Sequence, residues 1–156
     1  MEKTAQFNEI FDLYYQKILR LSKGYFNGDE AIASDVTQEI FIKIWENLSS
    51  FRNESKISTW IYRISVNTCL MYLRKLSTKK EINLNQLPHM PSESYSTEDD
   101  ERLRKMYACI QKLDEAGKLI ILMVLEGIEY HEIAKVVGIT EDTLRVRIHR
   151  IKKNLI

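Results

Sequence analysis

Apolar residues recur at helical spacing along most of the chain. In a first block, from about Gln6 to Leu76, they follow one another at steps of three and four residues, which is the period of an amphipathic helix. Three helices are expected there: one ending near Gly24, a second from about Asp29 to Leu48, and a third from about Ser58 to Leu76. No stretch alternates apolar and polar residues as a half-buried strand does. The pattern predicts an all-α fold.

A second helical block follows towards the C-terminal end. Within it, Leu119 to Leu125 is apolar around its whole circumference, which is typical of the buried centre of a small bundle. The stretch from Ser77 to Asp100 separates the blocks, holds both prolines and shows no sustained period, as a flexible linker does. Because a loop of this length is uncommon inside one compact domain, the sequence predicts two small helical domains, 1–76 and 101–156, joined by this linker.

The last two expected helices, Tyr130 to Val137 and about Glu141 to Asn154, are joined by a three-residue turn. In that turn Gly138 can adopt the left-handed conformation that ends a helix, and Thr140 can cap the helix that follows. Two short helices with a tight glycine-containing turn form the DNA-binding helix-turn-helix. The C-terminal domain is therefore predicted to contain a helix-turn-helix.

The second helix of this motif has two unlike faces. The inward stripe is apolar and comprises Leu144, Ile148, Ile151 and Leu155. The outward face has the donors and cations that base edges and phosphates require; it comprises Arg145, Val146, His149, Arg150, Lys152 and Lys153. A solvated helix of a small bundle would also be basic, but the turn that precedes this one favours DNA binding. For His149, a solvated position near the helix end is the simpler interpretation.

Charge and composition narrow the function further. The formal net charge of +1 averages over segments of opposite sign: 29–54 carries six acidic residues against two basic ones, and 56–80 carries six basic residues and no acidic one. Such alternation suits a protein that meets another protein with one face and nucleic acid with another. The apolar stretches are too short to cross a bilayer and the start has no apolar signal core, which favours the cytoplasm.

The two cysteines do not suggest a metal site. Cys69 and Cys109 lie far apart and have no partnering histidines, so they are too few for zinc and are expected to be buried, reduced thiols. No cofactor, metal or catalytic residue is predicted.

Three segments together resemble the extracytoplasmic-function (ECF) sigma factors of the sigma-70 family. The segment from Tyr130 to Lys153 resembles their fourth region, which reads the minus-thirty-five promoter element. The segment from Asp35 to Trp45 resembles the second-region helix that grips the polymerase clamp, and Phe51 to Thr68 resembles the adjoining part that melts and reads the minus-ten element. The three occur in the order of that family, on two helical blocks separated by a linker.

The resemblance implies a transcription initiation factor rather than an enzyme. Its expected partners are core RNA polymerase, through the beta-prime clamp and the beta subunit, and promoter DNA, with no small-molecule substrate. An anti-sigma factor is a common partner in the family, and nothing in this sequence identifies one. By matching positions, the polymerase-binding residues are Asp35, Gln38, Glu39, Ile42 and Trp45; the minus-ten residues are Trp60, Arg63 and Asn67; and the minus-thirty-five residues are Arg145, Val146, His149 and Arg150.

The helical periods agree with two of these assignments. Val36, Ile40, Ile44 and Leu48 form the inward stripe of the second helix, which leaves Ile42 on an acidic outward face. Single exposed apolar residues are ordinary, but an apolar residue ringed by polar groups is also how an interface anchor looks. In the third helix, Trp60, Arg63 and Asn67 share a stripe that could meet single-stranded DNA, with the amide of Asn67 in a base pocket closed by the loop 51–58. For Trp60, packing within the domain remains an alternative.

Two other classes of protein stay open at this point. A stand-alone helix-turn-helix regulator would need a dimerisation surface from the first block and should bind its operator without polymerase. A recombinase would need a nucleophile among clustered arginines near the start of the chain. The first block offers only Arg20 before Arg52, which makes an enzyme the weakest alternative.

Overall fold

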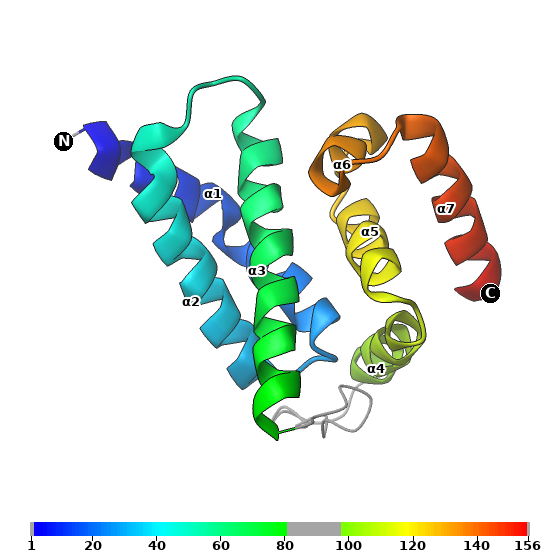
Figure 1. Ribbon diagram of the computed structural model, residues 1–156. Coiled ribbons are helices and arrows are strands. Elements are labelled where there is room, and N and C mark those ends of the chain that lie inside the picture. The colour runs from blue at the N-terminus through cyan, green and yellow to red at the C-terminus, as the bar shows by residue number, and fades with distance from the viewer. Residues whose placement is uncertain (1, 81–97, 156) are drawn as a thin grey trace.

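The computed structural model describes residues 2–80 and 98–155. Within these ranges the chain forms seven α-helices, one short 3-10 helix and no strand (Figure 1). The predicted all-α fold is confirmed. No helix in the described ranges combines the length and the apolarity that a membrane crossing requires.

The first block consists of α1 (Glu2–Tyr25), α2 (Glu30–Asn47) and α3 (Ile57–Lys80), with the 3-10 turn η1 (Leu48–Ser50) after α2. Between α1 and α2 the backbone turns through Gly28, whose φ of 78° is a left-handed value that suits glycine. Asp29 then caps α2, since its Oδ1 accepts a hydrogen bond of 2.9 Å from the Ile32 amide. These local signals explain why the expected and observed helix ends nearly coincide.

The expected core stripe of α2 is buried. Val36, Ile40 and Ile44 are fully inaccessible and Leu48 is nearly so, and they pack with apolar residues of α1 and α3. In α3, Tyr62, Val66 and Cys69 are buried as the helical period predicts. The opposite stripe of α3 stays accessible: Arg63, Asn67 and Arg74 are exposed and Trp60 is half-buried. The orientation of α3 expected from the sequence is therefore confirmed.

The second block consists of α4 (Glu98–Gln111), α5 (Glu115–Leu125), α6 (Tyr130–Val137) and α7 (Glu141–Leu155). Asp114 caps α5 by accepting a hydrogen bond of 2.7 Å from the Gly117 amide. Residues 119–123 are buried at the centre of the block, as expected. The expectation was wrong for Leu125, which is 58% exposed at the end of α5, where it lines an open groove beside Met106 and Cys109 of α4.

Two further expectations need correction. The helices on either side of the predicted linker are longer than expected, since α3 continues to Lys80 and α4 begins at Glu98. The acidic residues 98–101 complement the positive N-terminal end of α4. Residues 81–97 of that linker lie outside the described ranges. Cys109 is only half-buried, because one side of α4 borders an open groove, whereas Cys69 is buried as expected; both thiols are free.

The two blocks lie against each other, with α5 beside α1 and α6 beside α3 (Figure 1). The helices approach closely at Gly24, where an added Cβ would stand 2.2 Å from Leu122 Cδ2. The side-chain amide of Gln111 donates to the carbonyl oxygens of Gly24 and Tyr25, at 3.2 and 3.3 Å. The blocks thus meet through specific contacts. The boundaries at residues 76 and 101 remain a prediction.

Candidate functional site

The turn between α6 and α7 has the geometry of a helix-turn-helix. Gly138 is left-handed, at φ 76° and ψ 34°, and its amide donates to the Ala134 carbonyl at 2.9 Å. Thr140 Oγ1 then accepts a hydrogen bond of 3.2 Å from the Thr143 amide and so caps α7. The glycine ends one helix and the threonine starts the next, as the sequence predicted.

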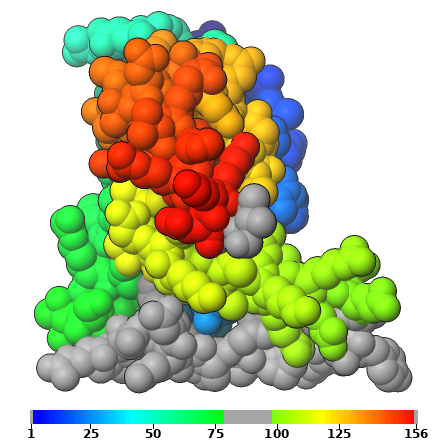
Figure 2. All heavy atoms as spheres, turned by 90° about the vertical axis from the view of Figure 1, so that its right-hand side faces the viewer, coloured from blue at the N-terminus to red at the C-terminus, as the bar shows by residue number. Residues whose placement is uncertain are grey.

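The two faces of α7 are as unlike as expected. Leu144, Ile148 and Ile151 are buried; the fourth member of that stripe, Leu155, has a side chain outside the described set. The outward residues Arg145, Val146, His149 and Arg150 are all exposed. Figure 2 shows α7 on the face turned to the viewer, where no other helix covers it.

Arg145 is held by two neighbours. Its Nη2 lies 3.5 Å from Glu141 Oε2, one turn earlier on α7, and its guanidinium lies 5.0 Å from the ring centroid of Tyr130 at the start of α6. An exposed ion pair contributes little to stability, but a guanidinium stacked on a ring has a restricted orientation. The i,i+4 spacing of Glu141 and Arg145 on a predicted helix could have indicated this ion pair from the sequence. Only the tertiary structure reveals Tyr130.

A second accessible site lies between η1 and α3. The loop after η1 turns back at Asn53, whose left-handed φ of 58° is one that asparagine tolerates. The ring of Phe51 thereby stacks on the ring of Trp60, with centroids 5.0 Å apart and planes at 32°. Beside this stack is an open cavity of about 420 Å³, lined by Ser50, Phe51, Arg52, Glu54, Ser55, Trp60, Arg63 and Lys135.

The cavity brings together two of the three predicted minus-ten residues. Trp60 and Arg63 line it, whereas Asn67 is exposed one turn farther along α3 and does not. Phe51 and Arg52 line it as well, although they were not singled out as site residues. An aromatic followed by a basic residue at the start of a loop was the signal that could have found them, because stacking and cationic groups suit single-stranded nucleic acid.

A third surface lies between α1 and α2. Ile42 is 57% exposed and Trp45 is 38% exposed, and Phe7 of α1 meets Trp45 edge-on at 5.3 Å. The open groove here has a volume of about 510 Å³ and is lined by Phe7, Phe11, Tyr15, Gln38, Phe41, Ile42, Trp45 and Glu46. Among the residues predicted to bind polymerase, Gln38, Ile42 and Trp45 therefore share one groove.

The remaining two predicted residues of α2 lie outside that groove. Asp35 is exposed, and Glu39 lies 3.9 Å from Lys43 Nζ and 3.8 Å from Lys75 Nζ. Burial raises the pKa of nearby Tyr72, and the negative charges of Asp35 and Glu39 raise it further. The acidic face expected from the sequence is therefore present on α2. The aromatic residues of α1 that extend the groove were not among the predicted site residues.

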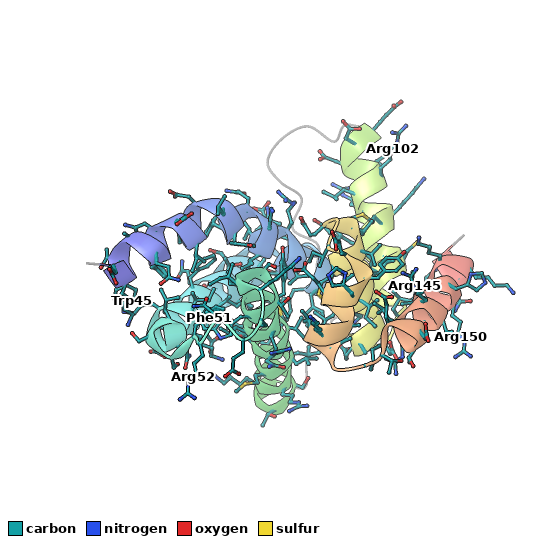
Figure 3. All side chains as sticks on the ribbon, turned by 90° about the horizontal axis from the view of Figure 1, so that it is seen from above. Trp45, Phe51, Arg52, Arg102, Arg145 and Arg150 are labelled. Carbon is teal, nitrogen blue, oxygen red and sulfur yellow. The ribbon has the colours of Figure 1, made fainter. Side chains whose placement is uncertain are left out.

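The three surfaces occupy different parts of the molecule. In Figure 3, Trp45 marks the end of the first block farthest from α7, while Phe51 and Arg52 lie on the loop that leads to α3. Arg145 and Arg150 lie together on α7, on the other side of the molecule.

Two family models match this chain and together cover both blocks. Sigma-70 region 2 matches residues 10–78, which hold the lining of the α1–α2 groove except Phe7 and that of the Phe51–Trp60 cavity except Lys135. Sigma-70 region 4 matches residues 103–155, which hold the helix-turn-helix. The ECF RNA polymerase sigma-E factor of Haemophilus influenzae is 32% identical over 162 residues, covering 94% of this chain and 84% of that protein. The chain belongs to the ECF sigma factors of the sigma-70 family.

Further relatives agree with that membership. The ECF RNA polymerase sigma-E factor of Escherichia coli K12 is also 32% identical, over 94% of this sigma factor and 83% of its own length. Two solved structures have the same fold. The sigma factor RpoE of Bartonella quintana, in complex with the anti-sigma factor NepR, has a TM-score of 0.77 at 18% identity, covering 96% of this chain and 94% of that one. CnrH in complex with the cytosolic domain of CnrY has a TM-score of 0.74 at 19% identity, covering 97% and 86%.

Membership of the family decides between the classes that the sequence left open. The chain is a sigma factor that directs RNA polymerase to promoters for transcription initiation. A stand-alone regulator is not favoured, because the first block matches sigma-70 region 2 rather than a dimerisation domain. Sigma factors regulate initiation without being catalysts themselves.

Proposed function

We propose that this sigma factor uses its three accessible surfaces for three separate tasks. The groove between α1 and α2 binds core polymerase, the Phe51–Trp60 cavity holds the melted minus-ten strand, and the outward face of α7 reads the minus-thirty-five element. The observation that carries the proposal is the ring stack of Phe51 and Trp60, with Arg63 lining the same open cavity. Aromatic rings beside cations favour single-stranded DNA.

The groove between α1 and α2 suits the polymerase clamp. Its floor is aromatic and its rim carries Gln38 and Glu46, which is the arrangement of an apolar anchor within a polar rim. Ile42 is the most accessible apolar residue of the groove and Trp45 the largest. We assign the beta-prime clamp to this groove, and with it we add Phe11 of α1 to the contact. Asp35 and Glu39 are assigned to the charged margin of the same interface. We assign the contact with the beta subunit to the second block.

The cavity suits an unstacked base. A base that leaves the duplex must regain the lost stacking on a protein surface, and each aromatic contact supplies about 1–3 kcal/mol. Trp60 already has one neighbour in Phe51, so a base can extend the stack, while Arg52 and Arg63 are near enough to meet the strand's phosphates. Asn67 lies one turn outside the cavity. We therefore assign it to a neighbouring nucleotide rather than to the base in the cavity.

The outward face of α7 suits the major groove. Arg145, which Glu141 and Tyr130 orient, is assigned to a base edge, where a bidentate arginine contact is typical of guanine. Val146, which is 51% exposed, is assigned to a thymine methyl group, since apolar side chains contact that group. His149 and Arg150 are assigned to the backbone phosphates.

The proposal also covers where the protein acts and how it is regulated. We infer that it acts in the cytoplasm, where polymerase is. We also infer regulation by an anti-sigma factor, because RpoE of Bartonella quintana, whose structure is similar to that of this chain, is described in complex with one.

Run-off transcription from genomic fragments tests the proposal. Core RNA polymerase is mixed with the fragments, with and without this protein, and the transcripts are sized. The expected result is a small set of defined transcripts that require the protein. If no fragment gives such a transcript while the purified protein alone binds duplex DNA tightly, the three assignments are wrong and a stand-alone regulator is the better account.

A further inference from the structure

The Phe51–Trp60 cavity contains a carboxylate as well as its rings and cations. Among the described residues that line the cavity, Glu54 is the one acidic side chain. It is exposed, and within residues 2–80 and 98–155 no basic side chain lies within ion-pair distance of it. An ionised carboxylate only accepts hydrogen bonds. Glu54 therefore offers two acceptor oxygens to a ligand in the cavity.

Three basic side chains from different parts of the fold line the same cavity. Arg52 comes from the loop after η1, Arg63 from α3 and Lys135 from α6. Arg63 donates through Nη2 to the Lys135 carbonyl at 3.0 Å, and this bond leaves its other N–H groups for a ligand. Guanidinium and ammonium groups both bind phosphate, the guanidinium often through two parallel hydrogen bonds. The surplus of cations over the single carboxylate therefore suits an anionic, phosphate-bearing ligand.

The rings and the size of the cavity suit a nucleobase. Phe51 and Trp60 are both half-buried, with ring centroids 5.0 Å apart, so part of the stack is accessible to a base. The volume of about 420 Å³ falls within the range of about 300–1,000 Å³ that is typical of small-molecule sites. Stacking rings, an acceptor and cations are thus gathered in a space of the right size for one nucleotide.

The carboxylate distinguishes between the bases. Guanine places two donors, N1–H and the N2 amino group, side by side on its Watson–Crick edge, so both oxygens of Glu54 can accept at once. Adenine and cytosine place a ring acceptor beside their amino group, and uracil has a carbonyl on each side of its N3–H. In these three bases the second carboxylate oxygen meets an acceptor, which repels it. Glu54 therefore favours guanine.

We propose that the free protein binds a guanine nucleotide with two or more phosphates in the Phe51–Trp60 cavity. The base stacks on the two rings, Glu54 accepts hydrogen bonds from N1–H and the N2 amino group, and the three cations bind the phosphates. This binding needs neither polymerase nor DNA and so goes beyond the proposed function. The nucleotide lies on the rings to which the minus-ten base is assigned, so the two ligands exclude each other.

Isothermal titration calorimetry on the full chain tests the site with GDP, ADP, CDP, UDP and pyrophosphate. GDP should bind at least about tenfold more tightly than the other nucleotides, because a bidentate pair with a base discriminates by that order. Pyrophosphate, which lacks the base, should bind more weakly than GDP. Lys135→Gln should weaken GDP and ADP alike. Lys112→Gln, which removes an exposed lysine outside the cavity, should weaken neither.

Glu54→Gln separates recognition of guanine from general electrostatics. The change makes the cavity more positive, so charge alone would tighten the binding of every nucleotide. The glutamine amide keeps one acceptor and replaces the other with a donor, so GDP should bind about tenfold more weakly while ADP does not. Glu9→Gln makes the same change of charge at an exposed residue of α1 and should leave GDP binding as in the parent. Since Glu54 is exposed, the melting temperature should change little.

The two tryptophans locate the bound nucleotide. Trp60 lines the cavity and Trp45 lines the α1–α2 groove, so GDP should shift the indole N–H signal of Trp60, and not that of Trp45, in the NMR spectrum of the isotope-labelled protein. A shift of the Trp45 signal instead would place the nucleotide elsewhere and overturn the proposal.

Three calorimetric results would also overturn it. The first is no binding of GDP at millimolar concentration. The second is equal affinity for GDP and either ADP or pyrophosphate, and the third is an affinity for GDP that stays the same or rises in Glu54→Gln. Failure of the proposed function is distinguishable, since it would appear as the absence of protein-dependent transcripts in the run-off assay.

Discussion

Phe51 of the loop after η1 and Trp60 of α3 form a ring stack, with centroids 5.0 Å apart. Both rings are half-buried and line one open cavity with Arg52 and Arg63. The two interpretations that the sequence allowed for Trp60, packing and DNA contact, are therefore compatible, because Phe51 covers part of the ring and the rest faces the cavity. Because Phe51 supplies the second ring of this stack, it is a better target for mutation than Trp60.

Phe51→Ala should impair promoter opening more than polymerase binding. The change removes one ring of the stack and should weaken binding of a single-stranded minus-ten oligonucleotide to the holoenzyme by about 1–3 kcal/mol. Since Phe51 is only half-buried, the melting temperature should change little. Phe51→Tyr, which keeps the ring, is the control and should bind nearly as the parent does. Equal binding by the alanine and tyrosine variants would remove the stack from the DNA site.

Asn67→Ala should impair open-complex formation less than Phe51→Ala does, because Asn67 lies one turn outside the cavity. Open-complex formation on fully duplex promoters, compared with a template carrying a pre-melted bubble, measures both variants. If Asn67→Ala is the more damaging change, the base is read on the exposed stripe of α3 and not beside Trp60.

Ile42→Asp should weaken association with core polymerase severely and leave the stability of the protein nearly unchanged. Ile42 is 57% exposed, and exposed substitutions usually change stability by no more than about 0.5 kcal/mol. Ile40, two residues earlier, is fully buried, so Ile40→Ala should cost about 2–5 kcal/mol of stability. Thermal unfolding and a polymerase-binding assay on both variants separate the two roles. A large drop in the melting temperature of Ile42→Asp would contradict the assignment of an anchor.

Arg145→Ala should relax sequence recognition at the upstream element, at a cost of about 1–3 kcal/mol if the guanidinium contacts a base. Tyr130→Leu should reproduce part of this loss, because it frees the guanidinium that lies over the ring. Arg147→Ala is the charge-matched control on the same helix. Binding of holoenzyme to promoters with single-base changes in the upstream element is the measurement. An equal loss for every sequence with Arg145→Ala would make Arg145 a phosphate contact.

Alkaline pH should destabilise the fold through Cys69. Burial is the main cause that raises the pKa of this thiol from its ordinary value near 9 to about 12. Between these values the unfolded chain releases the proton and the folded chain keeps it, so the free energy of unfolding falls as pH rises. Burial also raises the pKa values of Tyr25 and Tyr62, which adds to the fall above about pH 10. Chemical denaturation at pH 8, 9 and 10 should show a decline from pH 9 that Cys69→Ala reduces; an unchanged decline would exclude the thiol.

Local signals predicted most of the fold, because they act within a few residues. The left-handed Gly138 and the threonine cap at Thr140 appear where the sequence placed them, and α2 begins directly after Asp29, close to the expected start. The start of α4 at Glu98, three residues before the expected one, was missed because the acidic run 98–101 suits a loop and a helix start equally.

Long-range contacts could not be predicted in the same way. No period along the chain indicates that Arg63 bonds to the Lys135 carbonyl, 72 positions away, or that α1 supplies part of the groove beside Ile42. Helical period showed which residues of each helix would be accessible. The identity of the surfaces they form depends on how the helices pack.

The central claim is that the cavity of Phe51 and Trp60 holds melted DNA when the protein is bound to polymerase. Permanganate reactivity of unpaired thymines tests it most directly, on a promoter found by run-off transcription. With core polymerase and the parent protein, thymines of the minus-ten element should become reactive; with Phe51→Ala they should stay protected, although the complex still forms on the DNA. Equal thymine reactivity with the parent and with Phe51→Ala would contradict the account.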